Sequence, residues 1–549
     1  MVEPLVSNNK IKREGPVVLV IMDGVGYGKY QEGDAVKAAM TSNLDQLLSS
    51  CPNTKLKAHG LAVGLPSDDD MGNSEVGHNA MGAGRVFSQG AKLVGESISS
   101  GKMYQGDTWK KLIGNVIKNN STLHFIGLLS DGNVHSNIEH LKKMIVEAKK
   151  EGVKKVRVHA LLDGRDVGEM SALDYFDPFQ SFLDDLSKDS DFDARIASGG
   201  GRMVITMDRY NANWEMVEKG WHTHVLGDGR LFNSAHEAIE TLRKETGAID
   251  QDLPPFVIGE NGKPVGTIED GDSVILFNFR GDRAIEISKA FDEKDFKEFD
   301  RKRYPKVEYA GMMEYDGDLH IPSQYLVSPP QIDRTLAEYL CATGVKQFSI
   351  SETQKFGHVT YFFNGNRSGK FDDKLEEYVE IPSDKVPFEE RPWMKCAEIA
   401  DRVIDEIENG NWDLIKLNFP NGDMVGHTGV FEAVVCSMEA MDIQIGRIRD
   451  AVKKKGGVMI VTADHGNADD MFEHDKKGGV KRKENGEPKA KTSHSLNPVP
   501  LIIFDPAYNG EYSLTLNEGL GISSVAATLM EFLGYVPPKD YDKSVINLN

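Results

Sequence analysis

The chain has 549 residues, which is too many for a single hydrophobic core and predicts two to four domains. Acidic residues exceed basic ones by 85 − 64 = 21, so we expect no affinity for nucleic acid or for an anionic membrane surface. The N-terminal segment has no apolar signal region, and no run reaches the roughly 18 apolar residues of a membrane span, so neither secretion nor membrane insertion is predicted.

The cysteine pattern indicates a reducing compartment. Cys51, Cys341, Cys396 and Cys436 are scattered along the chain without C-x-x-C spacing. A disulfide framework is therefore not expected, and reduced thiols in the cytoplasm are the default. We expect a monomeric, cytoplasmic protein.

Several short apolar runs end abruptly in polar residues. They occupy residues 16–22, 123–132, 155–164, 273–279, 347–354, 414–422 and 457–463. Unbroken apolar runs of this length are typical of strands buried on both faces of a parallel sheet. Helical patterns between them predict helices at 138–150, 394–408, 431–455 and 522–532. This alternation predicts an α/β fold, in which ligands bind beyond the carboxyl ends of the strands.

One set of polar residues has the composition of a metal site. The sequence DMVGH places Asp423 and His427 four residues apart, so both can face one point on a helix or tight turn. TADHGN joins Asp464 to His465 directly after an apolar run. Any one of these residues alone is more often an ordinary polar side chain, but carboxylates mixed with imidazoles bind Zn²⁺, Mn²⁺ and similar ions. The six candidates, enough for two metals, are Asp23, Asp423, His427, Asp464, His465 and His494.

A second set of residues is mainly cationic and indicates anion binding. Two of its arginines lie three residues apart in FRGDR, after an apolar run. A single arginine is more often part of a surface ion pair, but guanidinium groups also bind phosphate and carboxylate through two parallel hydrogen bonds. In so acidic a chain, such pairs favour a bound anion. The set comprises His135, Arg165, Asp166, Arg202, Arg209, Arg280, Arg283 and Lys355.

The order of the two sets predicts how the domains are arranged. Metal candidates occur near residues 23–74 and again at 423–494, while the arginines lie between them. We therefore expect an outer metal-binding domain formed by residues 1–87 and 319–549. It would be interrupted by a substrate-binding domain of residues 88–318. The lysine-rich segment 472–491 is expected to be a solvated loop.

Ser74 lies in the segment MGNSEVGHNAMGAGR, which contains four glycines. The segment lacks the lysine of a P-loop. A serine hydroxyl is a poor nucleophile unless its pKa is lowered, which a metal ion can do. The glycines would let the backbone approach the metals and a phosphoryl group. Ser74 is therefore a candidate nucleophile, and the alternative is a helix-capping turn.

Taken in order, the segments DGVGYG, MGNSEVGHNAMGAGR, SDGNVHS, DGRD, GGGR…MDRY, FRGDR, ETQK, NGDMVGH, TADHGN and TSHS…PVP resemble those of the cofactor-independent phosphoglycerate mutases. These enzymes belong to the alkaline phosphatase superfamily. The resemblance covers the chain from about Val17 to the C-terminal region. It implies an alkaline-phosphatase-like outer domain around an inserted α/β domain.

The resemblance also implies roles for individual residues. One metal would be held by Asp423, His427 and His494, and the other by Asp23, Asp464, His465 and the Ser74 oxygen. Mn²⁺ is the first choice, with Mg²⁺ or Co²⁺ as alternatives. Ser74 would carry the phosphoryl group, with Asp166 and Lys355 also catalytic. The cationic set, including Arg209, would bind substrate.

The implied activity is the interconversion of 3-phosphoglycerate and 2-phosphoglycerate in glycolysis and gluconeogenesis, without 2,3-bisphosphoglycerate. Three alternatives remain within or near this chemistry. A metal-dependent phosphatase would resolve the phosphoserine with water, and a phosphopentomutase would share the metals but not this set of segments. A non-catalytic metal-binding protein would not need Ser74 beside the ligands. The absence of an R-H-G sequence argues against the phosphohistidine mutases.

Overall fold

The computed structural model describes residues 2–65, 68–188, 191–208, 213–315, 320–328, 330, 332–475, 477–483 and 485–549. The chain divides into two compact units. The outer unit comprises Met1–Ser88 and Gln331–Asn549, and the insert comprises Gln89–Pro330. The second division falls after the expected residue 318 because Tyr325 forms a bridge with Gly311, and the two residues after Tyr325 are buried in the insert's core.

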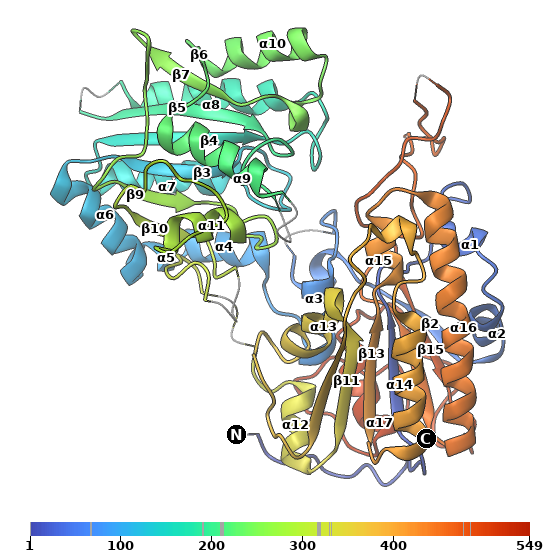
Figure 1. The fold of residues 1–549 in the computed structure, drawn as a ribbon. Helices are drawn as coiled ribbons and strands as arrows, with labels where there is room; N and C mark the ends of the chain where they lie inside the picture. The colour runs from blue at the N-terminus through green and yellow to red at the C-terminus, as the bar shows by residue number, and fades with distance from the viewer. Residues whose placement is uncertain are drawn as a thin grey trace. The chain divides into compact units, whose positions relative to one another are not determined.

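The outer unit is built on a largely parallel sheet. Within its described residues the sheet has seven strands in the order β12-β11-β13-β1-β14-β15-β2 (Figure 1). All residues of β1 and β13 are buried, as the apolar runs predicted. The strands β15 and β2 at one edge are antiparallel to their neighbours β14 and β15, respectively. The bounds are β1 Val17–Met22, β2 Asn53–Leu56, β11 Gln347–Glu352, β12 Glu376–Ile381, β13 Leu414–Phe419, β14 Val458–Thr462 and β15 Val499–Phe504.

Helices cover both faces of this sheet. The long helices α14 and α16 pack against each other and against the central strands, and α17 is seen behind the sheet in Figure 1. Three predicted helices are found as α14, α16 and α17, with starts that agree or differ by two residues. The bounds are α1 Ala35–Ala38, α2 Ser42–Ser50, α3 Ser74–Ala83, α12 Leu336–Thr343, α13 Thr353–Gly357, α14 Cys396–Asn409, α15 Asn421–Gly426, α16 Phe431–Lys455 and α17 Ser524–Phe532, with short turns η1 Gly60–Val63, η4 His358–Phe362 and η5 Phe388–Glu390.

The insert has a mixed sheet of its own. Its described residues form eight strands in the order β10-β9-β3-β4-β5-β7-β6, with β8 paired to β7. The strands from β10 to β5 are parallel, whereas β7 is antiparallel to β5. The bounds are β3 Leu123–Leu128, β4 Lys155–Leu162, β5 Asp193–Gly201, β6 Arg230–Phe232, β7 Phe256–Glu260, β8 Lys263–Pro264, β9 Ser273–Leu276 and β10 Glu308–Gly311.

The helices of the insert bury amphipathic faces against this sheet. The predicted helix 138–150 is present as α7, and the Asn137 side chain caps it by accepting from Glu139 N. The bounds are α4 Gly90–Ser99, α5 Lys102–Gln105, α6 Asp107–Asn119, α7 Ile138–Lys150, α8 Ala172–Leu186, α9 Trp214–Trp221, α10 Ala235–Thr246 and α11 Ile285–Asp292, with short turns η2 His222–Leu226 and η3 Asp250–Asp252.

The lysine-rich segment 472–491 is more ordered than the expected loop. Isolated bridges pair Phe472 with Ala490 and His474 with Val480. Its described residues therefore form an antiparallel ribbon, in which Lys477, Lys481 and Lys483 are exposed and Lys489 and Lys491 are half-buried. Among the residues that the structure describes, no helix combines the length and apolar character needed to cross a membrane.

Histidine rings are buried within the sheet of the insert. His124 Nδ1 on β3 lies 3.0 Å from His159 Nε2 on β4. His224, in the short π-helical turn η2, is also buried. Burial lowers the pKa of each ring, and lowers that of His224 to about 3. These rings are therefore neutral in the folded protein at neutral pH.

Acid is expected to destabilise the insert through these rings. A histidine in an unfolded chain has a pKa of about 6.5. Because folding lowers the pKa of His224 to about 3, below pH ~6.5 the unfolded state binds a proton that the folded state does not. Stability that is present above pH ~6.5 is therefore lost as the pH falls, by about 2 kcal/mol at pH 5 for His224 alone.

The measurement is the free energy of unfolding of the insert at pH 7 and pH 5. It is obtained from the hydrogen exchange of the β4 amides at increasing urea concentration. His224→Gln should lose about 2 kcal/mol less stability between the two pH values than the parent protein. His236→Gln is the control, because the side chain of His236 is 49% exposed. Equal acid dependence in the His224 variant and the parent would contradict the prediction.

Candidate active site

Polar residues of the outer unit meet where neighbouring parallel strands end. Asp23 follows β1, Asp464 follows β14, and Asp423 lies in α15 directly after β13. These strands are adjacent in the order β13-β1-β14, so their carboxyl ends share one edge of the sheet. His494 reaches the same edge because it precedes β15, which runs antiparallel to β14. Lys355, in α13 after β11, arrives there as well.

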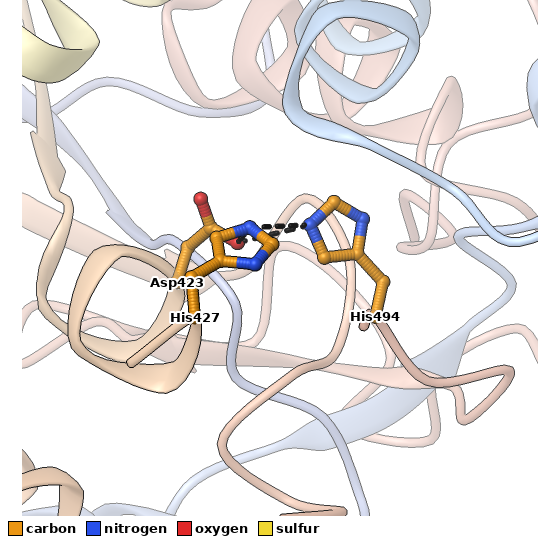
Figure 2. Close-up of side chains that lie close together, drawn as sticks. All are labelled: Asp423, His427 and His494. Carbon is orange, nitrogen blue, oxygen red and sulfur yellow. Dashed lines mark hydrogen bonds and ion pairs between the residues drawn. The ribbon is translucent and has the colours of Figure 1, made fainter. Parts of the chain in front are cut away.

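Asp423, His427 and His494 form a compact set of metal-type donors (Figure 2). The Nε2 atoms of the two rings are 3.1 Å apart, and each lies 3.1 Å from Asp423 Oδ1. His427 Nδ1 donates to Thr492 O, and His494 Nδ1 donates to Gly72 O, both at 2.7 Å. Because Nδ1 of each neutral ring carries the proton and donates it in a hydrogen bond to a carbonyl oxygen, Nε2 is unprotonated and has a free lone pair. The donor set therefore fits a bound metal ion.

Ser74 is the first residue of α3. The Asn73 side chain caps this helix by accepting from Val76 N at 3.0 Å. Ser74 Oγ is 2.9 Å from His465 Nε2 and 3.2 Å from Asp23 Oδ1, and it also accepts from Lys355 Nζ. The helix-capping turn is therefore present, but its capping side chain is Asn73, and the Ser74 hydroxyl remains a candidate nucleophile. The positive end of the helix dipole favours negative charge at Ser74.

Glycines bring the Ser74 helix close to its surroundings. A Cβ on Gly77 would lie 2.9 Å from Asp464 O, and one on Gly72 would lie 2.0 Å from Ala58 O. Any larger residue at either position would displace the helix. The glycine content of this segment thus reflects close packing around Ser74.

Asp23, Asp464 and His465 form a second buried group beside Ser74. His465 Nδ1 is 3.2 Å from Gly466 O, and its Nε2 is 3.5 Å from Asp23 Oδ1 and 3.6 Å from Asp464 Oδ2. Asp464 Oδ2 is buried and accepts no hydrogen bond from the described residues. Burial raises the pKa of Asp23 and of Asp464 to about 6, and repulsion adds to this, from Asp464 on Asp23 and from Asp423 on Asp464. A buried carboxylate oxygen without a donor, in such a group, fits a cation.

Asp423 differs from these two carboxylates. Burial alone would raise its pKa, but Lys355 and His427 hold the pKa well below its usual range. Lys355 Nζ lies 2.8 Å from Asp423 Oδ2 and 3.1 Å from Asp23 Oδ1. Lys355, which the sequence analysis grouped with the arginines, thus lies with Ser74, Asp23 and Asp423 in one cluster, called the Ser74 cluster below.

His78 and Asn418 contribute to this cluster and were not predicted. His78 Nδ1 donates to Ser74 O at 2.7 Å, so its Nε2 accepts from Asn418 Nδ2 at 3.1 Å. The same amide donates to Asp23 Oδ2 at 2.8 Å. His78 lies within metal-ligand distance of Asp23 and Asp464, but its two nitrogens are already committed. We therefore assign it to orienting Asn418 and, through it, Asp23. Its position four residues after Ser74, on the same helix face, was the available signal.

The insert gathers its own polar residues at the ends of parallel strands. Asp163, directly after β4, is the centre of one group and was also not predicted. Its Oδ1 accepts from Arg202 Nη1 at 2.9 Å and from the backbone N–H groups of Arg165 and Asp166 at 3.1 and 3.0 Å. Its Oδ2 accepts from Ser130 Oγ at 2.6 Å. The DGRD sequence carried this signal, because an aspartate before a turn often bonds to the backbone after it.

The remaining described candidates lie around Asp282. His135 Nδ1 is 3.7 Å from Asp282 Oδ1, and Arg280 Nε is 3.3 Å from the same oxygen. Burial lowers the pKa of His135, and the positive charges of Arg202, Arg280 and Arg283 lower it further. The structure thus brings His135, Arg202, Arg280 and Arg283 together. Arg209 lies outside the described residues.

Buried carboxylates and imidazole lone pairs at the carboxyl edge of a parallel sheet define a metal-dependent enzyme of the α/β class. In agreement, the sequence model of the Metalloenzyme superfamily matches residues 15–537. A Leptospira interrogans protein named "Probable 2,3-bisphosphoglycerate-independent phosphoglycerate mutase" is 55% identical over 97% of this chain and 98% of its own. The Trypanosoma brucei brucei protein named 2,3-bisphosphoglycerate-independent phosphoglycerate mutase is 50% identical over 97% of each chain. The chain belongs to the family of 2,3-bisphosphoglycerate-independent phosphoglycerate mutases.

A solved structure agrees with this assignment. The crystal structure of Leishmania mexicana phosphoglycerate mutase at low cobalt concentration is 49% identical in sequence. It superimposes with a TM-score of 0.86 and covers 100% of both chains. The mixed α/β architecture expected from the sequence is thereby confirmed.

Proposed function

We propose that this protein interconverts 3-phosphoglycerate and 2-phosphoglycerate by passing the phosphoryl group through Ser74, without 2,3-bisphosphoglycerate. The observation that carries the proposal is the position of Ser74 in a member of this family. Its hydroxyl lies at the start of α3 and within hydrogen-bond distance of His465 and Asp23. A serine used only for capping would not need carboxylates and imidazole lone pairs around it.

The proposed metal content is two divalent ions. The convergent Nε2 lone pairs support one site formed by Asp423, His427 and His494. Asp464 Oδ2, which is buried and accepts no hydrogen bond from the described residues, supports a second site. This site would be formed with Asp23, His465 and the Ser74 oxygen. Mn²⁺ is the first choice and Mg²⁺ or Co²⁺ are the alternatives, because a mixed oxygen and nitrogen donor set does not select one ion. When bound, such ions lower the pKa of the serine hydroxyl and offset the charge on phosphoryl oxygens.

The proposed reaction has two balanced transfers. Ser74 Oγ attacks phosphorus as the alkoxide, the bond from phosphorus to the 3-oxygen of glycerate breaks, and that oxygen takes a proton from Asp166. The 2-hydroxyl of the retained glycerate then returns a proton to Asp166 and attacks the phosphoserine, which releases Ser74 Oγ as the alkoxide. Asp166 is the proposed acid and base. Burial raises its pKa although Arg202 opposes this, which helps it to carry a proton near neutral pH.

We propose that the two units divide these tasks. The outer unit carries Ser74, the metal donors and Lys355, whose ammonium group is suited to stabilising phosphoryl charge. The insert binds the substrate through its cationic residues, including Arg209 by family resemblance. Glycerate has to be retained and water excluded while the acceptor hydroxyl changes.

The direct test is turnover by metal-loaded protein without 2,3-bisphosphoglycerate. We expect 2-phosphoglycerate to form from 3-phosphoglycerate with little inorganic phosphate. Release of phosphate and glycerate alone would instead identify a phosphatase of the same superfamily. Metal binding without turnover of either kind would leave a binding protein.

Weaker binding of the substrate by the insert should change the products as well as the rate. Arg283→Ala removes one guanidinium group and should raise KM about tenfold or more, as expected when a buried charged hydrogen bond is lost. The ratio of inorganic phosphate to 2-phosphoglycerate should also rise, because glycerate escapes before the second transfer. Arg230→Ala is the control, because Arg230 forms an exposed ion pair with Glu245 on the same unit. An unchanged ratio in the Arg283 variant would argue against retention by the insert.

We further propose that the enzyme is monomeric and cytoplasmic. Among the described residues all four cysteines are free thiols, which supports a reducing compartment. Light scattering and cell fractionation test these two points separately.

A further inference from the structure

A continuous chain of buried hydrogen bonds crosses the insert's sheet. It links side chains on the adjacent strands β3, β4 and β5 to the turn η2. The successive bonds measure 3.0, 3.0, 2.7, 2.8 and 2.9 Å. All of its members are buried, and none belongs to the candidate active site. In order, they are Asp272, His124, His159, Ser198, His224 and Thr206.

Asp272, at one end of the chain, determines which atom donates in each hydrogen bond. Asp272 also accepts from the backbone N–H groups of Thr122 and Glu269, each at 2.8 Å, and these donors favour its ionised form. An ionised carboxylate can only accept, so His124 donates to it through Nε2. The neutral His124 ring must then accept at Nδ1, where His159 Nε2 donates.

The same reasoning continues to the other end. His159 Nδ1 has no proton, so it accepts from Ser198 Oγ. Ser198 Oγ in turn accepts from His224 Nδ1, which leaves His224 Nε2 as an acceptor for the Thr206 hydroxyl. Every bond points from Thr206 toward Asp272. Hydrogen bonds aligned in this way polarise and strengthen one another.

Thr206, at the end of the chain, has an unfavourable backbone conformation. Its φ is 70°, and among the described residues it is the only β-branched one with positive φ. That region is strongly disfavoured for β-branched side chains, so surrounding contacts must maintain it. The contacts are the hydroxyl bond to His224, a bond from Thr206 N to Met216 O at 2.9 Å, and close packing on Gly220, and a bond from Met207 N to Ile205 O at 2.7 Å closes the turn around Thr206. A Cβ on Gly220 would lie 2.2 Å from Thr206 Oγ1.

The conformation of Thr206 sets the direction of the next carbonyl group. Met207 O accepts from Arg283 Nη1 at 2.7 Å, and Arg283 is buried. Rotation of the backbone at Thr206 would turn this carbonyl away from the guanidinium group. Arg283 would then lose a partner that holds it in place.

We propose that the chain from Asp272 to Thr206 is a positioning network for Arg283, with Thr206 as its terminal positioning residue. The inference rests on the proposed function, in which Arg283 binds the substrate. The network acts through backbone geometry and makes no contact with the reacting atoms.

Three variants of Thr206 separate the hydroxyl from side-chain bulk and backbone strain. Thr206→Val keeps the shape but removes the hydroxyl, and should weaken binding of 3-phosphoglycerate and raise KM roughly tenfold, with a smaller change in kcat. Thr206→Ser keeps the hydroxyl and should remain close to the parent. Thr206→Gly also lacks the hydroxyl but adopts positive φ without strain, so its defect should be smaller than that of the valine variant. A parent-like Kd and KM in the valine variant would overturn the proposal.

The measurements are made on metal-loaded full-length protein. Calorimetry gives the Kd for 3-phosphoglycerate, and the mutase assay gives KM and kcat. If the parent binds 3-phosphoglycerate without converting it, the proposed function fails, while the comparison of Kd values still decides the role of Thr206. If the parent does not bind it, both proposals fall.

A measurement on the unaltered protein guards against misfolded variants. Nitrogen NMR of histidine labelled with ¹⁵N should show neutral rings at neutral pH, with the proton on Nε2 of His124 and His159 and on Nδ1 of His224. Thr206→Val should shift the His224 signals and leave the exposed His236 unchanged. A charged ring or a reversed tautomer at any of the three positions would overturn the proposed direction of the network.

Discussion

Ser74→Ala should abolish phosphoglycerate mutase activity while the protein stays folded. The change removes the oxygen that forms and breaks bonds to phosphorus, and loss of a catalytic nucleophile typically costs on the order of 10⁴-fold or more in kcat. Asn73 caps α3 through its own side chain, so the helix does not depend on the Ser74 hydroxyl. Asp423, His427 and His494 are unchanged, so much of the metal binding should persist.

The measurements are kcat, metal content and capture of the intermediate. Rapid acid quenching of the parent with 3-phosphoglycerate, followed by mass spectrometry, should place a phosphoryl group on the peptide that contains Ser74. The variant should show none. Ser288→Ala is the control, because it removes another buried hydroxyl, whose partners Ala284 O and Tyr309 Oη both belong to the insert. Normal turnover in the Ser74 variant, or capture of the phosphoryl group on another residue, would exclude Ser74 as the carrier.

The central strands could be predicted because their environment is uniform. β1 and β13 are buried along their whole length, so their apolar runs are unbroken. The edge strand β2 has only four residues, and its burial alternates, so it left no comparable signal. The antiparallel direction of β15 was also hidden, because a buried strand has the same pattern in either direction.

The proposed nucleophile and metal ligands carried a clearer sequence signal than the residues that hydrogen-bond around them. Asp423 and His427 stand at a spacing that ligand geometry explains, and Ser74 lies among glycines whose closeness to neighbouring backbone the structure accounts for. Asn418 acts only through hydrogen bonds formed across the fold, and Asp163, besides the local backbone bonds that DGRD indicates, accepts from the distant residues Arg202 and Ser130. Such partners depend on strand order, which one sequence does not state.

The histidine network illustrates the same limit on a larger scale. His124, His159 and Ser198 lie on separate strands, and each looks like an ordinary core polar residue in the sequence. Their relation appears only when β3, β4 and β5 are placed side by side. The positive φ of Thr206 has no sequence signature either, because threonine is disfavoured there.

Removal of metal should have an effect comparable to the loss of Ser74. Thorough chelation is expected to lower kcat by on the order of 10³-fold or more, because the serine hydroxyl then keeps its high pKa and the phosphoryl charge is not offset. Activity should return with Mn²⁺ or Co²⁺. The protein should also unfold at lower temperature without metal, since a ligand at 100 times its Kd stabilises the folded state by about 2.7 kcal/mol.

The variants that test this prediction alter the side chains drawn in Figure 2. His427→Ala and His494→Ala each remove one Nε2 donor from the site that they share with Asp423, so each should weaken metal binding and require more metal for half-maximal rate. The double variant should be little worse than either single variant, because both remove ligands from one ion.

His236→Gln is the control, since its exposed ring lies on the insert. Metal content by mass spectrometry and rate against free Mn²⁺ are the measurements. Full activity in rigorously metal-free protein would rule out the proposed mechanism, whereas independent, additive losses from His427 and His494 would show that they do not serve the same ion.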